Sequence, residues 1–138
     1  MRLHWEHIPD STSAIEEFSR VLKPGGKIFI EVPFMQPLHA APMDYKRWTV
    51  NGLSNDLSRV GINVTDSGIS SGPASGLSWM LAEFISIVLS LGSTRIRKVI
   101  SLPIQALCSP LKWLDLILFW IPNSEVMASS IWVFGTKH

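Results

Sequence analysis

The stretch VLKPGGKIFIEVP, residues 21–33, decides how the rest of the sequence is interpreted. It joins the end of a helical pattern to a short apolar strand through a Pro-Gly-Gly turn. Pro24 cannot continue a helix, and the two glycines after it permit the positive φ angles of a tight reversal. The strand over residues 27–32 is rich in isoleucine and ends at Pro33, a pattern typical of a buried strand in an α/β sheet. Because ligands bind beyond the carboxyl ends of strands in such sheets, we expect the functional residues to follow Val32.

Size and composition limit the classes of protein that this chain represents. Its 138 residues suffice for about one domain, and its net charge is only +1. Without a stripe of Lys and Arg or a row of stacking aromatic residues, no nucleic-acid partner is expected. The single cysteine, Cys108, excludes an internal disulfide and indicates a reducing, cytoplasmic compartment. Residues 1–10 lack the apolar core of a signal peptide.

Helices are predicted on both sides of the central stretch. Ser13 and Glu16 have the spacing of a capping box, which predicts a helix beginning near Ser13. A second helix is predicted over residues 50–60, with Thr49 as its N-cap and Gly61 as its C-terminal glycine. The remaining predictions are a brief strand over residues 62–65, a Ser/Gly/Pro linker over 67–76 and a final strand over 129–135.

Residues 77–121 are strongly apolar but are interrupted by prolines and a few charges, so they make no clean membrane span. Two interpretations remain open. The segment is a helical insert that contacts a membrane and brings the site to a lipid-linked or amphiphilic acceptor, or it is a helical lid on its own domain or on a second subunit. The first rests on residue types favoured at a bilayer interface, namely Trp79, Trp113, Trp120, Arg95, Arg97 and Lys98.

Two strings of residues, in this order, resemble the class I S-adenosylmethionine-dependent methyltransferases, and more closely their type 11 branch. The first is WEHIPD, residues 5–10, followed by a helix that ends in RVLKPGG, residues 20–26. The second is a loop of the form His-x-x-Pro-x-Asp-Tyr-x-Arg-Trp-Thr, residues 39–49. The similarity covers residues 3–66 well and residues 129–137 loosely. It implies an α/β fold with a partial Rossmann-like methyltransferase sheet (the region of strands 4–7), an inserted apolar helical segment and a closing antiparallel strand.

The resemblance further implies that the chain is the C-terminal half of such a domain, because the family's Gly-x-Gly turn and ribose-binding acidic residue have no counterpart in the sequence. We therefore expect the methyltransferase core over residues 1–76, an apolar insert or lid over 77–122 and the closing strand over 123–138. Little activity is expected from the chain alone. A complementary half or a second copy of the chain is the expected partner at an exposed sheet edge.

The site residues are likewise implied by the resemblance. The loop after strand 4 packs beside the cofactor in this family, and the loop after strand 5 lines the acceptor pocket. His39 is the candidate general base, since its unperturbed pKa lies near neutrality, while Asp44 would orient it and Arg47 would pair with an anionic group. The implied cofactor side comprises His4, Trp5, Glu6 and His7, and the implied acceptor side comprises His39, Asp44, Tyr45 and Arg47.

Simpler interpretations of these residues stay open. Asp44 and Arg47 are spaced for a local ion pair that steadies the loop. Tyr45 would then roof the core, and two histidines without further clustered ligands predict no metal site. The implied activity is transfer of a methyl group from S-adenosylmethionine to a small or glycan- or lipid-linked acceptor, in the cytoplasm or at the inner face of the membrane. The alternative is a non-catalytic fragment or partner subunit.

Overall fold

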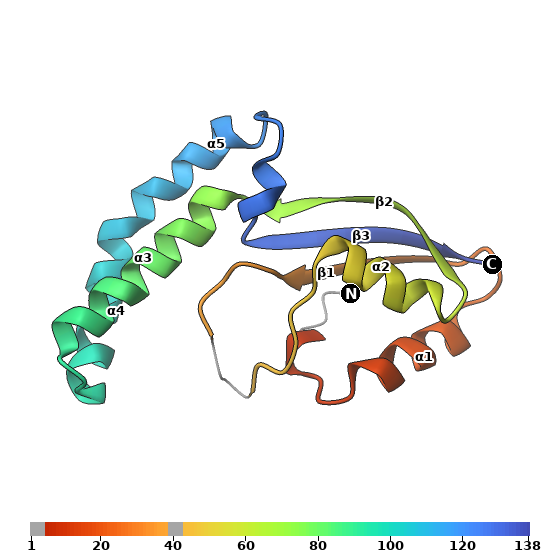
Figure 1. Ribbon diagram of the computed structural model, residues 1–138, viewed down its shortest axis with the longest axis horizontal. Coiled ribbons are helices and arrows are strands. Elements are labelled where there is room, and N and C mark those ends of the chain that lie inside the picture. The colour runs from red at the N-terminus through yellow and green to blue at the C-terminus, as the bar shows by residue number, and fades with distance from the viewer. Residues whose placement is uncertain (1–4, 39–42) are drawn as a thin grey trace. The chain divides into compact units, whose positions relative to one another are not determined.

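The computed structural model describes residues 5–38 and 43–138, and it has the predicted α/β fold (Figure 1). The chain divides into two compact units. The first, here called the sheet unit, comprises Met1–Phe34, Leu38–Ser70 and Ser130–His138. The second, here called the helical unit, comprises Met35–Pro37 and Ser71–Ser129.

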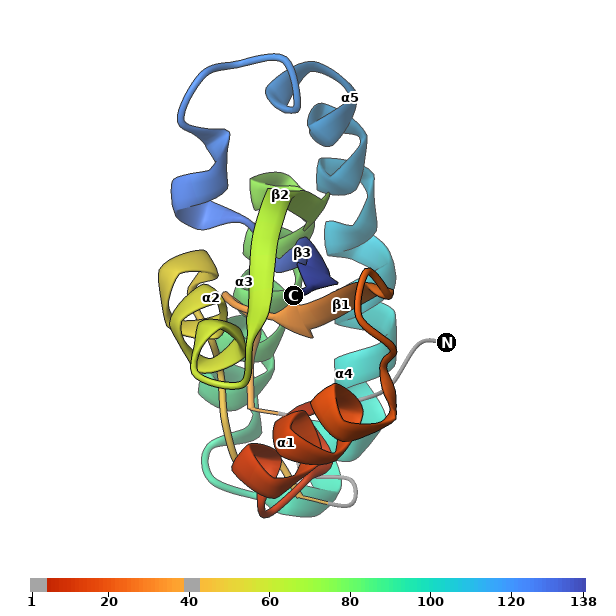
Figure 2. The ribbon, with the colours of Figure 1, turned by 90° about the vertical axis from the view of Figure 1, so that its right-hand side faces the viewer.

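The sheet unit is built on three strands, β1 (Lys27–Pro33), β2 (Ile62–Ser71) and β3 (Ser130–Lys137), in the order β1-β3-β2. Figure 2 shows β3, the last strand of the sequence, between the two earlier ones. It runs antiparallel to β1, with Val133 opposite Ile30. This confirms the closing antiparallel strand that the sequence predicts.

Three helical segments belong to this unit: η1 (Trp5–His7), α1 (Ser11–Val21) and α2 (Val50–Ser58). The predicted start of the first helix near Ser13 is wrong by two residues, because Asp10 is the N-cap. Its carboxylate accepts hydrogen bonds from the Ser13 amide at 3.0 Å and from the Ser13 hydroxyl at 2.6 Å. Thr49 caps α2 as predicted, accepting from the Gly52 amide at 3.1 Å.

One face of the sheet carries the core of this unit. Ile30 and Val32 of β1 and Val133 of β3 are fully buried there, as are Leu53 and Leu57 of α2. The Pro-Gly-Gly turn feeds β1 into this core, with Gly25 at a φ of 76°. The central stretch thus does what its composition predicts: it stops α1, reverses the chain and starts a strand.

The opposite face explains why the predicted linker over residues 67–76 is wrong. β2 continues to Ser71 because Gly68 leaves room for Trp132, whose ring atoms would lie 2.8 Å from a Cβ at this position. Trp132 also stacks on the exposed Phe29, with ring centroids 5.7 Å apart. Pro73 then opens the next helix at its first position, where the missing N–H has no intrahelical role.

The helical unit contains α3 (Pro73–Ser90), α4 (Thr94–Cys108), η2 (Ser109–Leu114), α5 (Asp115–Leu118) and η3 (Ser124–Met127). Figure 1 shows α3 and α4 side by side as a hairpin, and they pack against each other along their length. Leu91 and Gly92 both take positive φ angles in the turn between them. Within the described residues, α3 is the one helix long and apolar enough to cross a membrane, with a mean hydropathy of 1.3.

Asp115 fixes the first turn of α3 from a distant part of the chain. Its buried carboxylate accepts from the amides of Ala74 at 2.8 Å and Ser75 at 2.9 Å, and from the Ser75 hydroxyl at 2.6 Å. Gly72 makes this approach possible, because a Cβ there would lie 2.3 Å from a carboxylate oxygen. A residue that interrupts an apolar run in the sequence therefore serves as the N-terminal cap of another helix.

Candidate functional site

The two segments that the sequence analysis assigns to the cofactor and to the acceptor meet in the sheet unit. The Tyr45 amide donates a hydrogen bond to the Glu6 carbonyl at 2.7 Å. The His7 ring donates from Nδ1 to the Met43 carbonyl. The short helix η1 and the chain before α2 are thus tied together by main-chain groups, over a separation of more than thirty residues.

Trp5 and Glu6, both predicted on the cofactor side, are buried. Trp5 packs against Phe18 of α1 with ring centroids 4.9 Å apart, so its ring belongs to the core. The Glu6 carboxylate lies 3.6 Å from Nε2 of His7. The Glu6 side chain is 5% exposed and the His7 side chain 16%, so water has little access to this contact.

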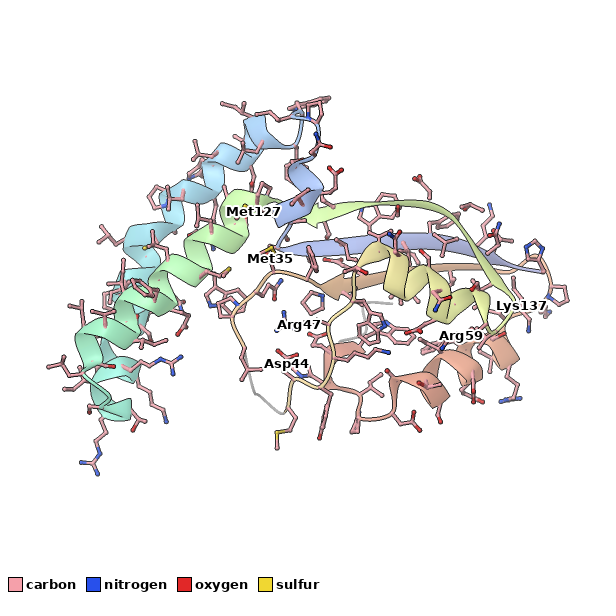
Figure 3. All side chains as sticks on the ribbon, viewed as in Figure 1. Met35, Asp44, Arg47, Arg59, Met127 and Lys137 are labelled. Carbon is pink, nitrogen blue, oxygen red and sulfur yellow. The ribbon has the colours of Figure 1, made fainter. Side chains whose placement is uncertain are left out.

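Asp44 and Arg47 form a two-pronged ion pair, and Figure 3 shows their side chains directed at each other. Nε of Arg47 donates to Oδ1 of Asp44 at 3.1 Å, and Nη2 donates to Oδ2. The Asp44 side chain is only 2% exposed, whereas the Arg47 side chain keeps 24% of its surface. This geometry is that of the local ion pair, and it fixes the plane of the guanidinium.

A second polar cluster, which the sequence analysis missed, joins the same loop to α2. Asp56 accepts from the buried Trp48 indole N–H at 2.9 Å and from the Lys46 ammonium at 3.0 Å. The ammonium also lies 4.6 Å from the centre of the Trp48 ring. Partial burial raises the pKa of Asp56, but the Trp48 and Lys46 hydrogen bonds, together with the positive charges of Lys46 and Arg59, lower it more, so this pKa lies below its ordinary value of 3.8. Trp48 and Asp56 are eight residues apart, a spacing that predicts no contact, so the sequence alone does not reveal this pair.

Two positions beside these clusters face solvent. Tyr45 is 53% exposed and Met43 is also exposed, so Tyr45 is open to a ligand and does not roof the core. His4 and His39, the remaining predicted site residues, lie outside the described residues. Within residues 5–38 and 43–138, no three His, Cys, Asp or Glu side chains gather as metal ligands.

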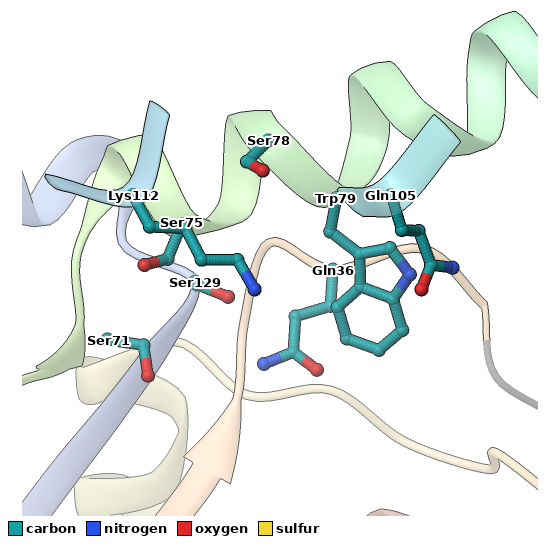
Figure 4. Close-up of a pocket in the computed structure, with 8 residues that line it drawn as sticks. All are labelled: Gln36, Ser71, Ser75, Ser78, Trp79, Gln105, Lys112 and Ser129. Carbon is teal, nitrogen blue, oxygen red and sulfur yellow. The ribbon is translucent and has the colours of Figure 1, made fainter. Parts of the chain in front are cut away.

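The helical unit holds a separate polar pocket of about 310 Å³ (Figure 4). Hydroxyl, amide and indole groups line it, together with the ammonium of Lys112. Such a lining offers many donors and one positive charge, which suits a small polar or anionic group. The lining residues are Gln36, Ser71, Ser75, Ser78, Trp79, Gln105, Lys112 and Ser129.

No family model and no curated protein matches the sequence. Among solved structures, the chain is similar to the cyclase SpnF, with a TM-score of 0.49 and 14% identity over 99% of this chain and 47% of that one. It is similar to a putative sarcosine dimethylglycine methyltransferase from Galdieria sulphuraria, with a TM-score of 0.46 and 16% identity over 96% of this chain and 49% of that one.

A third similar structure is phosphoethanolamine N-methyltransferase 2 from Haemonchus contortus, solved with phosphomonomethylethanolamine and S-adenosylhomocysteine. Its TM-score is 0.42, with 16% identity over 99% of this chain and 32% of that one. The chain therefore spans about half or less of the length of each of these three proteins. A cyclase stands among them beside two methyltransferases, so the likeness by itself names no reaction.

Proposed function

We propose that this chain forms the acceptor-side part of an S-adenosylmethionine-dependent methyltransferase of the type 11 branch. Its proposed reaction transfers a methyl group to a small or glycan- or lipid-linked acceptor in the cytoplasm. The supporting observation is the direct contact between the two strings that resemble the family. Glu6 and His7 meet Met43 and Tyr45 through hydrogen bonds, in the same unit whose closing strand β3 runs antiparallel to β1.

The described residues fit one wall of a cofactor site. The η1 turn presents His7 with its ring oriented by the Met43 carbonyl, and Glu6 lies beside it. None of the nine glycines stands in a Gly-x-Gly turn, and those with positive φ angles lie in turns at Gly25, Gly61 and Gly92. The proposal therefore assigns this chain residues that flank the cofactor, and it does not assign it the Gly-x-Gly turn that cradles the methionine part of the cofactor in this family.

Each residue has a distinct proposed role. The cofactor, when bound, supplies an electrophilic methyl group. An acceptor hydroxyl or amine must lose a proton as it gains that methyl group, and His39 is the proposed general base. Arg47 is the proposed anchor for an anionic group of the acceptor, and Tyr45 supplies an exposed ring beside it. Asp44 is the proposed positioning residue, because its two carboxylate oxygens accept hydrogen bonds from Nε and Nη2 of Arg47.

Calorimetric titration of S-adenosylmethionine into the purified 138-residue chain tests the cofactor part of this proposal. S-adenosylhomocysteine serves as a second ligand. Saturable binding that weakens in His7→Ala, and not in the exposed control Glu17→Gln, would support the assignment of η1. If the chain is folded but binds neither ligand, the proposed cofactor-binding role of this chain is contradicted.

Measuring KM and kcat separately for variants of the acceptor-side residues tests the roles proposed for them. With any acceptor that is methylated, Arg47→Lys should raise KM because a point charge cannot replace a planar fork. Asp44→Asn should act in the same direction, since it loosens the guanidinium, and His39→Ala should lower kcat. An Arg47→Lys variant with unchanged KM would contradict the anchor role.

A non-catalytic partner subunit is the second candidate function, and the open face of the sheet favours it. Phe29 and Trp132 stack on that face, and Phe29 is exposed. An apolar sheet face beside a strand edge is suited to a complementary half or a second copy of the chain. Light scattering separates the two candidates: a stable dimer broken by Phe29→Lys, together with no cofactor binding, favours the partner subunit.

A further inference from the structure

The α3–α4 hairpin has an inverted distribution of side chains. The residues that α3 buries are all small, whereas most of its large apolar side chains are exposed and the other two, Trp79 and Ile85, are half-buried. A helix of a water-soluble domain normally does the opposite, turning Leu, Ile, Phe and Val inward. The buried set is Ala74, Gly76, Ser78, Ala82, Ser86 and Ser90, and the exposed set is Leu77, Met80, Leu81, Phe84, Ile87, Val88 and Leu89.

The buried serines are satisfied within the protein. Ser78 donates to the Cys108 carbonyl of α4 at 2.8 Å, which joins the two helices. Ser86 and Ser90 donate to carbonyls of their own helix, at 2.7 Å to Ala82 and 2.9 Å to Ile87. Small residues and internally bonded hydroxyls at a helix–helix interface are the pattern of helices that meet in lipid, where no water competes for them.

The second helix continues this apolar surface. Val99 and Leu102 of α4 are 75% and 73% exposed, and only Cys108 of this helix is buried. Beyond it, Trp120 is 87% exposed and Trp113 is exposed as well. An apolar groove of about 550 Å³, lined by the first turns of α3 and by residues 114–127, adjoins the same region. The exposed apolar area thus extends over both helices and the segment after them.

The charges of the helical unit are arranged for an anionic surface. Two of its three acidic groups are engaged internally, because Asp115 caps α3 and Glu83 pairs with Arg97 at 2.6 Å, while Glu125 in η3 is exposed. Arg95 and Lys98 at the start of α4 and Lys112 in η2 are exposed. Cations and tryptophans at the borders of an apolar surface are the composition of a membrane interface.

We propose that the face of the α3–α4 hairpin formed by its exposed apolar side chains is a membrane-contact surface, and that its occupant is an anionic lipid bilayer. Large apolar side chains of both helices enter the acyl region, while Arg95, Lys98 and Lys112 bind the headgroups. Only 33% of α3 is buried, whereas a core helix of a soluble domain is mostly buried.

Vesicle flotation tests the proposal: the full chain is purified in mild detergent, transferred to lipid vesicles, and the fraction that floats with the vesicles is measured. The full chain should float with vesicles of phosphatidylglycerol and phosphatidylcholine, and less with phosphatidylcholine alone. Reversing the charge in Arg95→Glu with Lys98→Glu should weaken binding to the anionic vesicles by roughly twentyfold or more, at about fivefold per basic residue. Both side chains are exposed and Arg95 lies in the first turn of α4, where an acidic residue is favourable, so this variant should stay folded.

A second pair of variants examines the apolar face itself. Val99→Gln with Leu102→Gln should strongly weaken flotation without changing the far-UV circular dichroism, since both side chains are exposed and neither substitution adds a charge. Val21→Gln, at an exposed apolar site of the sheet unit, is the matched control and should float as the unaltered chain does.

Three results would each overturn the proposal. They are no flotation of the unaltered chain, flotation that the Val99 and Leu102 variants leave intact, and a lipid-independent dimer that these variants break. The last result would identify a second copy of the chain as the occupant of the face. Because no step of this test involves S-adenosylmethionine, its outcome is independent of the proposed methyltransferase function.

Discussion

Asp115 shows how one side chain can hold a helix from outside it. Its carboxylate accepts from the Ala74 and Ser75 amides and from the Ser75 hydroxyl. Asp115→Ala leaves these buried donors without an acceptor, and we expect it to lower the free energy of unfolding by about 2–3 kcal/mol. Asp115→Asn keeps one acceptor oxygen and should cost less. Chemical denaturation measures both, with the exposed Glu125→Gln as the control; an Asp115→Ala variant as stable as this control would contradict the capping role.

Asp56 predicts a pH dependence of stability whose sign follows from its lowered pKa. Its burial raises the pKa, but the Trp48 and Lys46 hydrogen bonds and the charges of Lys46 and Arg59 together outweigh burial, so the folded state favours the carboxylate. The contribution is therefore complete well above the ordinary pKa of 3.8, which the unfolded chain has, and is lost as the pH falls through the lower folded value. Urea denaturation of the unaltered chain and of Asp56→Asn should give a stability difference that is constant from pH 7 to about pH 5 and shrinks below about pH 4. A difference that grows on acidification would contradict the assignment.

At the scale of the element, local chemistry predicted where the chain turns. Pro24 and Gly25 end α1, Thr49 caps α2, and the final strand is where its β-branched and aromatic residues predict it. These features depend on backbone angles and caps that neighbouring residues determine. The sequence did not reveal the length of β2, because residues 67–71, with three serines and a glycine, have the composition of a loop and become a strand only when β3 pairs with β2.

The candidate site was predictable to the same local extent. The Asp44–Arg47 pair follows from its spacing, and the structure contains it. The contact of η1 with the loop before α2, and the joining of Trp48 to Asp56, depend on tertiary packing that no spacing encodes. The cap that Asp115 supplies to α3 is hidden for the same reason, since forty residues separate the partners along the chain.

Substituting Gly68 tests whether the space it leaves for Trp132 is what allows β2 to continue to Ser71. An alanine Cβ would approach ring atoms of Trp132 to 2.8–2.9 Å, so the indole must leave its stack on Phe29. We expect Gly68→Ala to destabilise the sheet unit by about 1–3 kcal/mol, the usual cost of overpacking. The same substitution in a Trp132→Leu background should cost much less. Denaturation of the four chains of this double-mutant cycle measures the coupling, and additive effects would show that Trp132 does not require the glycine.

At the scale of the whole molecule, the order of the strands in the sheet differs from their order in the sequence. β3 comes last in the chain but lies between β1 and β2, so the sheet unit closes only after the entire helical unit has been passed. Lys137, near the end of β3, adds to this closure by donating hydrogen bonds to the Ser19 and Leu22 carbonyls at the end of α1. Contacts of such large sequence separation are costly in loop entropy, which predicts slow folding of this unit.

A substitution at Val133 tests whether the two units unfold independently of each other. It is fully buried in the central strand, and Val133→Asp places an unpaired charge among Ile30, Leu53 and Leu57. We expect hydrogen exchange to lose protection across β1, α2 and β2, while the α3–α4 hairpin keeps its own, because each unit has internal packing of its own. Val99→Asp, at an exposed site of α4, is the control and should leave the sheet unit protected. If Val133→Asp removes protection from α3 as well, the two units fold as one cooperative body, and the hairpin depends on the sheet that the last strand completes.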